Sequence, residues 1–567
     1  MVATARKAFL RRPVFFLFMT LFAAALIALS FTNCGGSMSS SGTGSGSTPP
    51  PSSPPPSTPP PTTGNDVVTY HNDNARTGQN LNETVLTLSN VNSTSFGKLL
   101  TISADGKINA EPLYLSGLTV NSATHNVLFV ASEHGTVYAF DADSGAMLWH
   151  VSTLMSGETT SDDHGCSQIT PEIGVTSTPV LDRNAGPHGT IYVVGMSKDG
   201  SGGYHQRLHA LDVTTGAEEF GGPKEIQATF PGGGDNSSSG TVTFAPGQYA
   251  QRSGLLLMNG VIYTAWTSHC DIRPYTGWII SYDQTTLAQV SVLNLTPNGN
   301  EGAIWMSGAG PAADSSGNIF ALDANGSFDS TLDTNGFPNH GDYGNAFLKI
   351  STTSNKMAVA DYFEMFNQAA ENGSDADLGS GGALVLPDLQ DNSGKTWHLA
   401  VGAGKDNNIY LVDRDSMGKF NASANNIHQE LQGVLAGGIW SMPAYFNNTV
   451  YFGAVGNNIK AFAISNAQLS ASPTSQTANS FTYPGATPSI SANGTSNAIL
   501  WATENTSAAV LHAFDATNLT HELYNSNQAS GGRDQFGSAN KFITPMIVNG
   551  KVYVGTTSGV GVFGLLH

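Results

Sequence analysis

Short apolar runs, each about five residues long, recur from near residue 96 to the end of the chain, and turns rich in glycine and aspartate separate them. The clearest unit has apolar runs at 126–131, 135–141 and 147–149. Runs of this length joined by tight turns are typical of antiparallel strands. The unit therefore predicts a meander of three strands.

This unit recurs along the rest of the chain. Seven further copies begin near residues 190, 261, 318, 398, 450, 498 and 551. A short strand that opens with a small residue or a proline introduces each copy, as at Pro112, Pro179 and Pro443. Proline is tolerated at the first residue of a strand, where no ladder donor is lost. These short strands are therefore predicted to be the innermost ones, crowded around a central axis.

The last copy supplies three strands and then reaches His567, so its outer strand is missing. The apolar stretch 96–102, ahead of the first copy, can fill that place and close a ring. Closure removes the exposed edges of an open sheet. The sequence thus predicts an all-β fold, an eight-bladed β-propeller of four-stranded antiparallel blades closed by an N-terminal strand. A stack of β-sandwiches is the alternative, but it requires neither a proline-led inner strand nor an incomplete last unit.

Residues 1–34 have the order of an export signal. Basic residues precede an apolar run over 14–29, and Cys34 follows it; the basic residues are Arg6, Lys7, Arg11 and Arg12. This order indicates export, and the cysteine is a candidate lipid attachment site. We expect an extracytoplasmic protein, either a membrane-anchored lipoprotein in the periplasm or at the cell surface, or a secreted protein. Cleavage without lipidation and an uncleaved anchor remain open.

Residues 35–65 consist almost wholly of Ser, Gly, Thr and Pro. Such a segment cannot bury enough apolar surface to offset its ordering entropy, so we expect a disordered tether. Residues 66–567 are predicted to form a single domain. The formal net charge of -19 argues against nucleic acid as a partner, because phosphate binders cluster Lys and Arg.

One unit carries a family signature. Ala139, Asp141, Gly145 and Trp149 occur at the spacing of the blade motif of the quinoprotein propellers, and the chain from 96 to 567 resembles that family as a repeat pattern. The resemblance implies a quinoprotein-like β-propeller over 66–567, in which Trp149 docks one blade on the next. Phe220 and Leu523 stand at the tryptophan position in other units.

The resemblance also implies a candidate cofactor, pyrroloquinoline quinone. The quinone alcohol dehydrogenases of this fold carry an adjacent pair of half-cystines over the cofactor, a Ca²⁺ site beside it and sometimes a haem. The only cysteines here are Cys34, Cys166 and Cys270, so the adjacent pair and a Cys-x-x-Cys-His motif are absent. In its layout of signal, tether and ring, the chain is also similar to the lipoprotein scaffold of outer-membrane barrel assembly, a propeller without redox activity.

In a propeller, the connections between blades and those between second and third strands open on one face. Long inserts around 155–175, 230–252 and 325–345 fall in such connections, so this face is the expected binding site. Cys166 and Cys270 lie in two of these connections on adjacent blades. We expect them to form a structural disulfide, with two unpaired thiols as the alternative.

Two groups of acidic residues are candidate Ca²⁺ ligands. They are Asp323, Asp329, Asp333 and Asp342 in the fourth unit, and Asp375 and Asp377 before the fifth. Oxygen-rich loops suit Ca²⁺, although neither group has EF-hand ordering, and turn-forming aspartates are the alternative. His164 and His269 flank the half-cystines but lack the tight spacing of a transition-metal site.

Aromatic and basic residues at the ends of strands on this face are candidate ligand contacts. Trp305 and Trp440 each precede an innermost strand. The cations are Arg252 and Arg533, which also precede innermost strands, and Lys198 and Lys405, which follow second strands. They suit a planar, anionic or hydroxylated ligand at the mouth of the channel. Packing between blades and ion pairing with loop carboxylates are the alternatives.

Two functions follow from these features. The favoured one is a binding or scaffold module at the cell envelope. We expect a monomer that presents its insert-rich face to a protein or glycan and meets the membrane only through its N-terminal anchor. The alternative is an oxidoreductase of alcohols or sugars that depends on pyrroloquinoline quinone and Ca²⁺. The missing half-cystine pair favours the first, no cofactor is firmly implied, and no catalytic residue is assigned.

Overall fold

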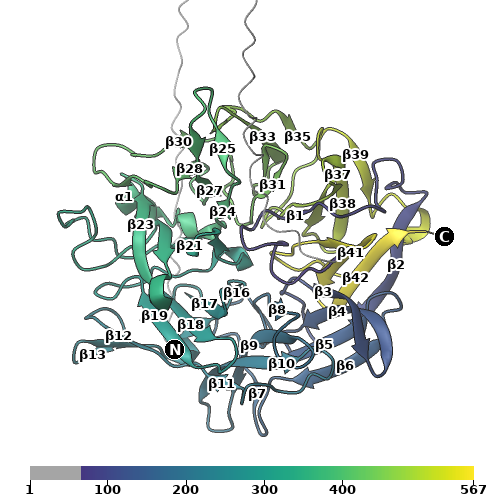
Figure 1. Ribbon diagram of the computed structural model, residues 1–567, viewed down its shortest axis with the longest axis horizontal. Helices are drawn as coiled ribbons and strands as arrows, with labels where there is room; N and C mark the ends of the chain where they lie inside the picture. Colours follow the sequence, from purple (N-terminus) through teal and green to yellow (C-terminus); the bar gives the residue numbers. More distant parts are fainter. Residues whose placement is uncertain (1–64, 567) are drawn as a thin grey trace, which may run out of the picture. The chain divides into compact units, whose positions relative to one another are not determined.

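A computed structural model of the chain describes residues 65–566, which form a ring of eight antiparallel blades (Figure 1). The strands of each blade follow one another from the axis to the rim. This confirms the predicted eight-bladed propeller. The signal, the candidate lipid site Cys34 and nearly all of the tether lie outside the described residues. No helix within residues 65–566 is both long and apolar enough to cross a membrane.

The blades are numbered in chain order, with their strands given from the axis outward. Blades 1 to 4 are β3 (Leu113–Val120), β4 (Ala123–Ala131), β5 (Thr136–Asp141) and β6 (Met147–Ser152); β8 (Val180–Asp182), β9 (Thr190–Lys198), β10 (Tyr204–Asp212) and β11 (Lys224–Glu225); β16 (Leu256–Met258), β17 (Val261–Ser268), β18 (Trp278–Asp283) and β19 (Gln289–Asn294); and β20 (Ala312–Ala313), β21 (Asn318–Leu322), β22 (Phe347–Ser351) and β23 (Ala358–Glu364).

Blades 5 to 8 are β24 (Leu384–Val385), β27 (Leu399–Ala403), β28 (Ile409–Asp413) and β30 (Gln429–Leu431); β31 (Ala444–Phe446), β32 (Thr449–Gly453), β33 (Ile459–Ser465) and β35 (Ser475–Gln476); β36 (Ser489–Asn493), β37 (Ser496–Glu504), β38 (Val510–Asp515) and β39 (Glu522–Asn525); and β40 (Met546–Val548), β41 (Lys551–Thr556), β42 (Gly559–Leu565) and β2 (Phe96–Ser103).

Short strands extend the blades or form small sheets in the inserts. They are β1 (Gln79–Asn80), β7 (Thr159–Thr160), β12 (Thr229–Pro231), β13 (Ser237–Ser238), β14 (Thr241–Thr243), β15 (Tyr249–Ala250), β25 (Leu389–Gln390), β26 (Thr396–Trp397), β29 (Lys419–Phe420) and β34 (Gln468–Leu469). The α-helix of the described residues is α1 (Gln368–Ser374), and 3₁₀ turns span Pro246–Gln248, Met306–Gly308, Thr353–Asn355, Leu378–Ser380 and Ser530–Gly532.

The ring closes as the sequence predicts. Strand β2 pairs with β42 from Phe96 opposite Leu565 to Ser103 opposite Gly559, and so supplies the outer strand of blade 8. Phe96 is fully buried, and its ring centre lies 5.0 Å from that of Tyr524 in blade 7. The closing strand therefore completes one blade and also packs against the next.

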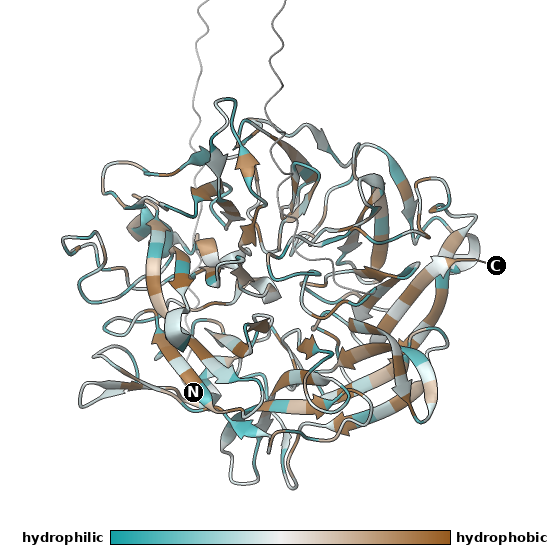
Figure 2. Ribbon diagram, in the orientation of Figure 1, coloured by the Kyte–Doolittle hydropathy of each residue, from teal (hydrophilic) through white to brown (hydrophobic). Residues whose placement is uncertain are grey.

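Apolar side chains fill the space between neighbouring blades, and Figure 2 shows hydrophobic residues concentrated on the strands. Trp149 illustrates the contact. Its indole N–H donates to the carbonyl of Val213 in blade 2 at 3.0 Å. A Cβ on Gly216 would lie 2.7 Å from the Trp149 ring, so the glycine makes room for the indole. The docking role that the family resemblance implies for Trp149 is borne out.

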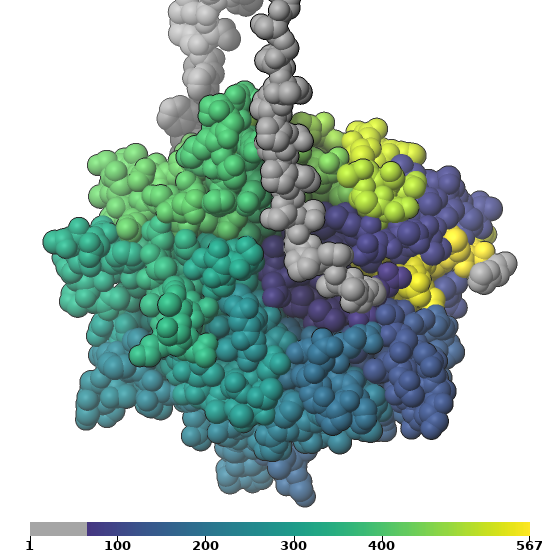
Figure 3. Space-filling view, in the orientation of Figure 1, coloured from purple at the N-terminus to yellow at the C-terminus, as the bar shows by residue number. Residues whose placement is uncertain are grey.

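Residues 66–80, which we call the axial segment, occupy the centre of the ring (Figures 1 and 3). The segment bonds to the second residue of all eight innermost strands. The bonded residues are Tyr114, Leu181, Leu257, Ala313, Val385, Tyr445, Ile490 and Ile547. The distances run from 2.6 to 3.0 Å. Polar groups at the crowded axis are thus satisfied by another part of the same chain.

Arg76 anchors the axial segment. Its side chain is fully buried and donates to the carbonyls of Tyr70, Leu255 and Pro311 at 2.8, 3.1 and 3.0 Å, and to the hydroxyl of Thr69 at 2.7 Å. Burial lowers the pKa of Arg76 to about 10. These bonds tie the segment to the inner strands of blades 3 and 4.

Candidate functional site

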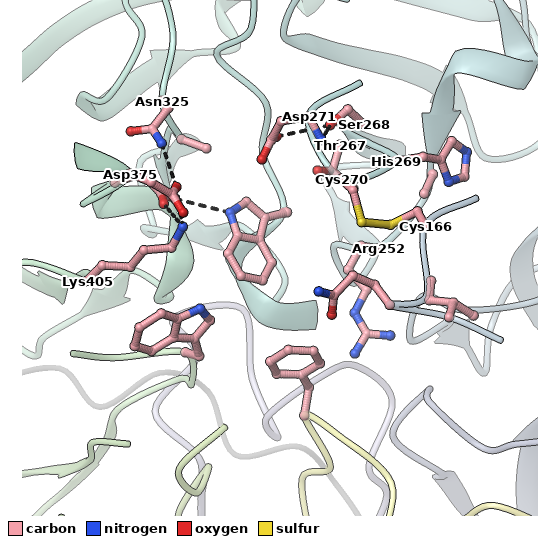
Figure 4. Close-up of a pocket in the computed structure, with 18 of the residues that line it drawn as sticks. Cys166, Arg252, Thr267, Ser268, His269, Cys270, Asp271, Asn325, Asp375 and Lys405 are labelled. Atoms are coloured by element: carbon pink, nitrogen blue, oxygen red, sulfur yellow. Dashed lines mark hydrogen bonds and ion pairs between the residues drawn. A yellow bond between two sulfur atoms is a disulfide. The ribbon is translucent and has the colours of Figure 1, made fainter. Parts of the chain in front are cut away.

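A cavity of about 370 Å³ opens at the mouth of the central channel (Figure 4). Its walls come from the connections that enter innermost strands and from the loops between the second and third strands of blades 3, 4 and 5. The sequence predicts that these connections share a binding face. The axial segment bonds to residues further along the same inner strands. It therefore lies deeper in the channel than the cavity walls.

A disulfide forms part of the wall. Cys166, in the connection that enters blade 2, is bonded to Cys270, in the loop between β17 and β18 of blade 3, with 5.6 Å between their Cα atoms. The expected bridge is present. Beside it the imidazoles of His164 and His269 are stacked, with ring centres 3.9 Å apart. Burial, followed by the neighbouring His164, lowers the pKa of His269 to about 4, so this pair is uncharged at neutral pH.

Aromatic rings line another part of the cavity. They are Trp305, Trp440, Tyr483 and Phe542, from the connections that enter blades 4, 6, 7 and 8. Trp305 and Phe542 are in edge-to-face contact at 6.2 Å, as are Trp440 and Tyr483 at 6.0 Å. The Trp305 indole N–H also donates to Asp377 Oδ2 at 3.2 Å. The tryptophan is therefore fixed by both packing and hydrogen bonding.

Lys405 is held between two carboxylates. Its Nζ lies 2.6 Å from both Asp375 Oδ1 and Asp377 Oδ1, and about 6 Å from the ring centres of Trp305 and Trp440. Burial by itself lowers the pKa of Lys405, but the two carboxylates outweigh it and raise that pKa. The lysine therefore stays protonated. Burial raises the pKa of Asp377 in turn, against the opposing effect of Lys405.

Arg252 supplies a second cation to the cavity, from the connection that enters blade 3. Only 7% of this residue is exposed, and within residues 65–566 its guanidinium has no hydrogen-bond acceptor and no ion-pair partner. Its Cζ lies 4.9 Å from the ring centre of Phe542. Burial lowers the pKa of Arg252. A buried guanidinium that faces a cavity without a counter-ion is suited to an anionic ligand.

Lys541 and Lys107 extend this positive region. Burial lowers the pKa of Lys541, and the charges of Arg252 and Lys107 lower it further. The negative charge near Arg252 comes from Glu133, a fully buried carboxyl group whose pKa is raised by burial. Glu133 is engaged by Asn109, Gly174 and Thr176 rather than by the arginine. The region around Arg252 is therefore more positive than the one around Asp377.

The structure separates the residues that the sequence proposes for this site. Trp305, Trp440, Arg252 and Lys405 line the cavity together, as do Asp375 and Asp377. Lys198 and Arg533 do not line it. Lys198 bonds to Asp162 and Tyr204 outside the cavity, and Arg533 pairs with the neighbouring Asp534 at 2.7 Å. Both cations are neutralised by local carboxylates, which corrects their expected place in the channel mouth.

The acidic candidates of the fourth unit also lie elsewhere. Asp329 Oδ2 pairs with His340 Nδ1 at 2.8 Å, and Asp342 Oδ1 accepts the N–H of Asn298 at 2.9 Å. Neither residue lines the cavity, and both organise the insert around 325–345. Within residues 65–566, no group of three or more His, Cys, Asp or Glu side chains is arranged to hold a metal ion.

Tyr483, Phe542 and Asn325 line the cavity but were not singled out from the sequence. Tyr483 and Phe542 precede innermost strands, as Trp305 and Trp440 do. The same positional rule, applied to every blade, would have identified them. Asn325 follows a second strand, and its amide donates to Asp375 Oδ1 at 2.9 Å.

No family model matches the chain, and no curated protein matches it either. Solved structures do. The quinohemoprotein alcohol dehydrogenase of Comamonas testosteroni aligns with a TM-score of 0.58 at 13% identity, over 88% of this chain and 80% of that one. The quinohemoprotein alcohol dehydrogenase ADHIIG of Pseudomonas putida HK5 aligns with a TM-score of 0.57 at 13% identity, with the same coverage. A europium-containing methanol dehydrogenase aligns with a TM-score of 0.54 at 12% identity, over 88% and 98%. The chain thus has the propeller fold of quinoprotein dehydrogenases.

Proposed function

We propose that this protein is an oxidoreductase of alcohols or sugars that holds pyrroloquinoline quinone in the cavity at the channel mouth. The printed names of the similar structures, quinohemoprotein alcohol dehydrogenase and methanol dehydrogenase, support this reading. At 12–13% identity, however, they bear on the fold alone. The observation that carries the proposal is Arg252, a buried cation without a counter-ion that faces an aromatic cavity.

The cavity residues fit the chemistry of this cofactor, which is a flat fused ring system bearing three carboxylates. The indoles of Trp305 and Trp440 offer planar apolar surfaces beside the Cys166–Cys270 bridge. The Arg252 guanidinium matches a carboxylate, because its donors are arranged to bind two oxygens at once. Both requirements of the ligand, stacking and charge neutralisation, are therefore met by residues of this chain.

The quinone, when bound, supplies the redox chemistry by accepting two electrons from an alcohol. The chain itself supplies a proton acceptor. Asp377 is buried, and burial raises its pKa, which suits the carboxylate to accept a proton, while Lys405 Nζ, 2.6 Å from its Oδ1, opposes that rise. Trp305 fixes the other oxygen through its indole N–H. We assign Asp377 the task of taking the hydroxyl proton of the substrate.

Calcium does not fit the cavity at the positions that the sequence suggests. A divalent cation at Asp375 and Asp377 would take the place of the Lys405 ammonium, which already neutralises both carboxylates. Ca²⁺ binds six to eight oxygen ligands, whereas this corner offers two carboxylates and the Asn325 amide. No step of the proposed reaction is therefore assigned to calcium in the cavity.

The experiment is a titration of the purified chain with pyrroloquinoline quinone, in which tryptophan fluorescence measures binding. Dye-linked oxidation of alcohols and sugars then measures turnover. We expect quenching and turnover in the wild type. Arg252→Ala should weaken quinone binding about 30-fold, since a charge-assisted bond is worth about 2 kcal/mol. Lys198→Ala, a cation outside the cavity, should leave binding unchanged. Asp377→Asn should retain binding and lose turnover.

Absence of quinone binding would overturn the proposal and favour the second candidate, a binding module at the cell envelope. The observation that favours the module is the exposure of large apolar side chains at the rim, where Ile272 is 49% and Tyr483 41% exposed. A protein or glycan that docks on the insert-rich face would cover them. Capture of a partner that Ile272→Asp abolishes would support this second function.

We also propose that the chain works outside the cytoplasm, anchored through Cys34 or secreted. The Cys166–Cys270 disulfide supports this location, because structural disulfides persist in oxidising compartments. Mass spectrometry of the N-terminal peptide tests it. A lipid-modified Cys34 indicates anchoring, whereas an unmodified chain that starts at Met1 and is recovered in the cytosol would contradict export.

A further inference from the structure

Two buried carboxyl groups at the end of blade 4 nearest the cavity have no hydrogen-bond partner within residues 65–566. Asp323 and Glu364 are fully buried, and none of their four carboxyl oxygens accepts a hydrogen bond from residues 65–566. A buried carboxylate without a partner costs several kcal/mol, so it needs either a cation or a proton. The two groups lie beside the cavity but do not line it.

The strand register places these two groups in one row on the same face of blade 4, on either side of Ala346. The pairing of β21, β22 and β23 aligns Asp323, Ala346 and Glu364 in one row across the blade, and the Asp323 N–H donates to the Ala346 carbonyl at 2.9 Å. Residues in one row of a sheet point to the same face. The small Ala346 side chain lies between the two acids. The space above Ala346 is therefore bordered by a carboxyl group on each side.

Further buried oxygen atoms without hydrogen-bond partners belong to the loop that follows β21 and to helix α1. They are the amide oxygens of Asn325 and Asn372 and one carboxyl oxygen of Glu371. Helix α1 carries two of these residues, and Asn372 Nδ2 donates to the Gly326 carbonyl at 2.8 Å, which fixes the helix over the end of β21. The buried Asn345 contributes an unpartnered amide nitrogen, while its oxygen accepts the N–H of Leu378.

No lysine or arginine neutralises the pair within the described residues. Lys405, the cation on this side of the cavity, is engaged by Asp375 and Asp377. Burial raises the pKa of Asp323 and of Glu364, and the charge of Asp323 raises the pKa of Glu364 further. Two ionised carboxylates would repel each other here, so a single shared counter-charge is the arrangement that satisfies both.

We propose that a Ca²⁺ ion binds between Asp323 and Glu364, with the amide oxygens of Asn325 and Asn372 as further ligands under helix α1. Carboxylate and amide oxygens are the ligands that Ca²⁺ takes, at 2.3–2.6 Å in flexible geometry. Of the acids that the sequence proposes for Ca²⁺, Asp323 belongs to this site, whereas Asp329 and Asp342 do not. The ion would hold α1 and the cavity wall at Asn325 in place.

The inference does not rest on the proposed oxidoreductase activity, and its test needs no quinone. The full chain is purified, passed over a desalting column in metal-free buffer and analysed for bound metal. We expect about one Ca²⁺ per chain in the wild type. Asp323→Asn and Glu364→Gln should each lose it, because each removes one of the two charges.

Matched variants locate the ion. Asp329→Asn, a carboxylate of the outer insert, and Arg252→Ala, in the cavity, should retain one Ca²⁺ per chain. Chelation should lower the Tm of the wild type by about 5 °C, added Ca²⁺ should restore it, and Glu364→Gln should show neither change. These are direct readouts of binding, independent of catalysis.

Three results would overturn the inference. The first is a wild-type chain that holds no Ca²⁺ and whose Tm chelation leaves unchanged, which would mean that the two acids share a proton. The second is Ca²⁺ that survives in the Asp323→Asn/Glu364→Gln double variant. The third is Ca²⁺ that only Asp375→Asn and Asp377→Asn remove, which would place the ion in the cavity. Since the wild type alone decides the first result, a variant that fails to fold does not weaken the test.

Discussion

The imidazole of His71 lies 2.9 Å from the carbonyl of Pro488, 417 residues further along the chain. The contact joins the axial segment to the residue just before the innermost strand of blade 7. The other imidazole nitrogen lies 2.9 Å from the Arg76 carbonyl, and the His71 N–H donates to the fully buried Glu111 at 2.8 Å. The histidine is thus bonded to its own segment and to the ring.

Stability should therefore be sensitive to Gly78, which packs on His71. A Cβ at Gly78, where φ is +68°, would lie 2.3 Å from the imidazole. We expect Gly78→Ala to lower the free energy of unfolding by about 3 kcal/mol, measured by urea denaturation. Gly433→Ala is the control, because Gly433 has φ +67° and open space around its Cβ position. It should cost only about 1 kcal/mol. Equal losses in both variants would contradict close packing at the axis.

Closure of the ring predicts that two residues of strand β2 contribute differently to stability. Phe96 is fully buried between blades 7 and 8, whereas Leu99 on the same strand is 37% exposed. Phe96→Ala should destabilise the chain by about 3–5 kcal/mol through lost burial and a cavity. Leu99→Ala should cost less than about 1 kcal/mol in the same urea titration. Similar values for the two would mean that β2 does not close the ring in solution.

The disulfide should stabilise the fold measurably. Cys166 and Cys270 are 104 residues apart in the chain, and closing a loop of about that length is worth about 5 kcal/mol in the chain-entropy estimate. The Cys166→Ser/Cys270→Ser variant should lose stability of this order, and a reductant should lower the Tm of the wild type but leave that variant unaffected. A reductant-insensitive wild type would contradict the bridge.

Acid should weaken the contact between Glu158 and Arg207. The two side chains form paired hydrogen bonds of 2.8 Å each. Although burial raises the pKa of Glu158, the bonds from Arg207 outweigh it and lower the pKa from 4.5 to about 2. Because the folded pKa is depressed, the stabilisation is fully present above about pH 4.5 and is lost as the pH falls toward 2.

The expected contribution is about 1–2 kcal/mol, with allowance for solvent screening. Urea denaturation at pH 7 and pH 3 measures it, and Glu158→Gln should remove that part of the pH dependence. Asp415→Asn is the control, since 65% of its side chain is exposed. A Glu158→Gln profile that parallels the wild type would contradict the assignment.

The candidate site was predictable in part. Trp305, Trp440 and Arg252 were found because each precedes an innermost strand, and the ring brings all such positions to one mouth. Lys198 and Arg533 satisfied a similar rule but point to Asp162 and Asp534. The direction of a long side chain depends on which carboxylate lies within reach, and the position of a residue in its repeat does not contain that information.

The pair of acids behind the cavity shows the same limit. The sequence offers Asp323 as one of several candidate Ca²⁺ ligands in the fourth unit, but it does not single out Glu364, which stands at the end of a strand. Their proximity depends on the registers of β21, β22 and β23 and on the small Ala346 between them. No spacing along the chain expresses this, because the two residues lie on nonadjacent strands.

The sequence by itself determined the blades, their number and the closing strand. Each depends on local alternation of apolar residues and turns, repeated often enough to reveal the ring. Only the tertiary structure decided the path of the axial segment, the partners of each cation and the meeting of Asp323 with Glu364. These features come from hydrogen bonds and charges between residues far apart in the chain, where burial and side-chain direction determine the outcome and no periodic pattern records it.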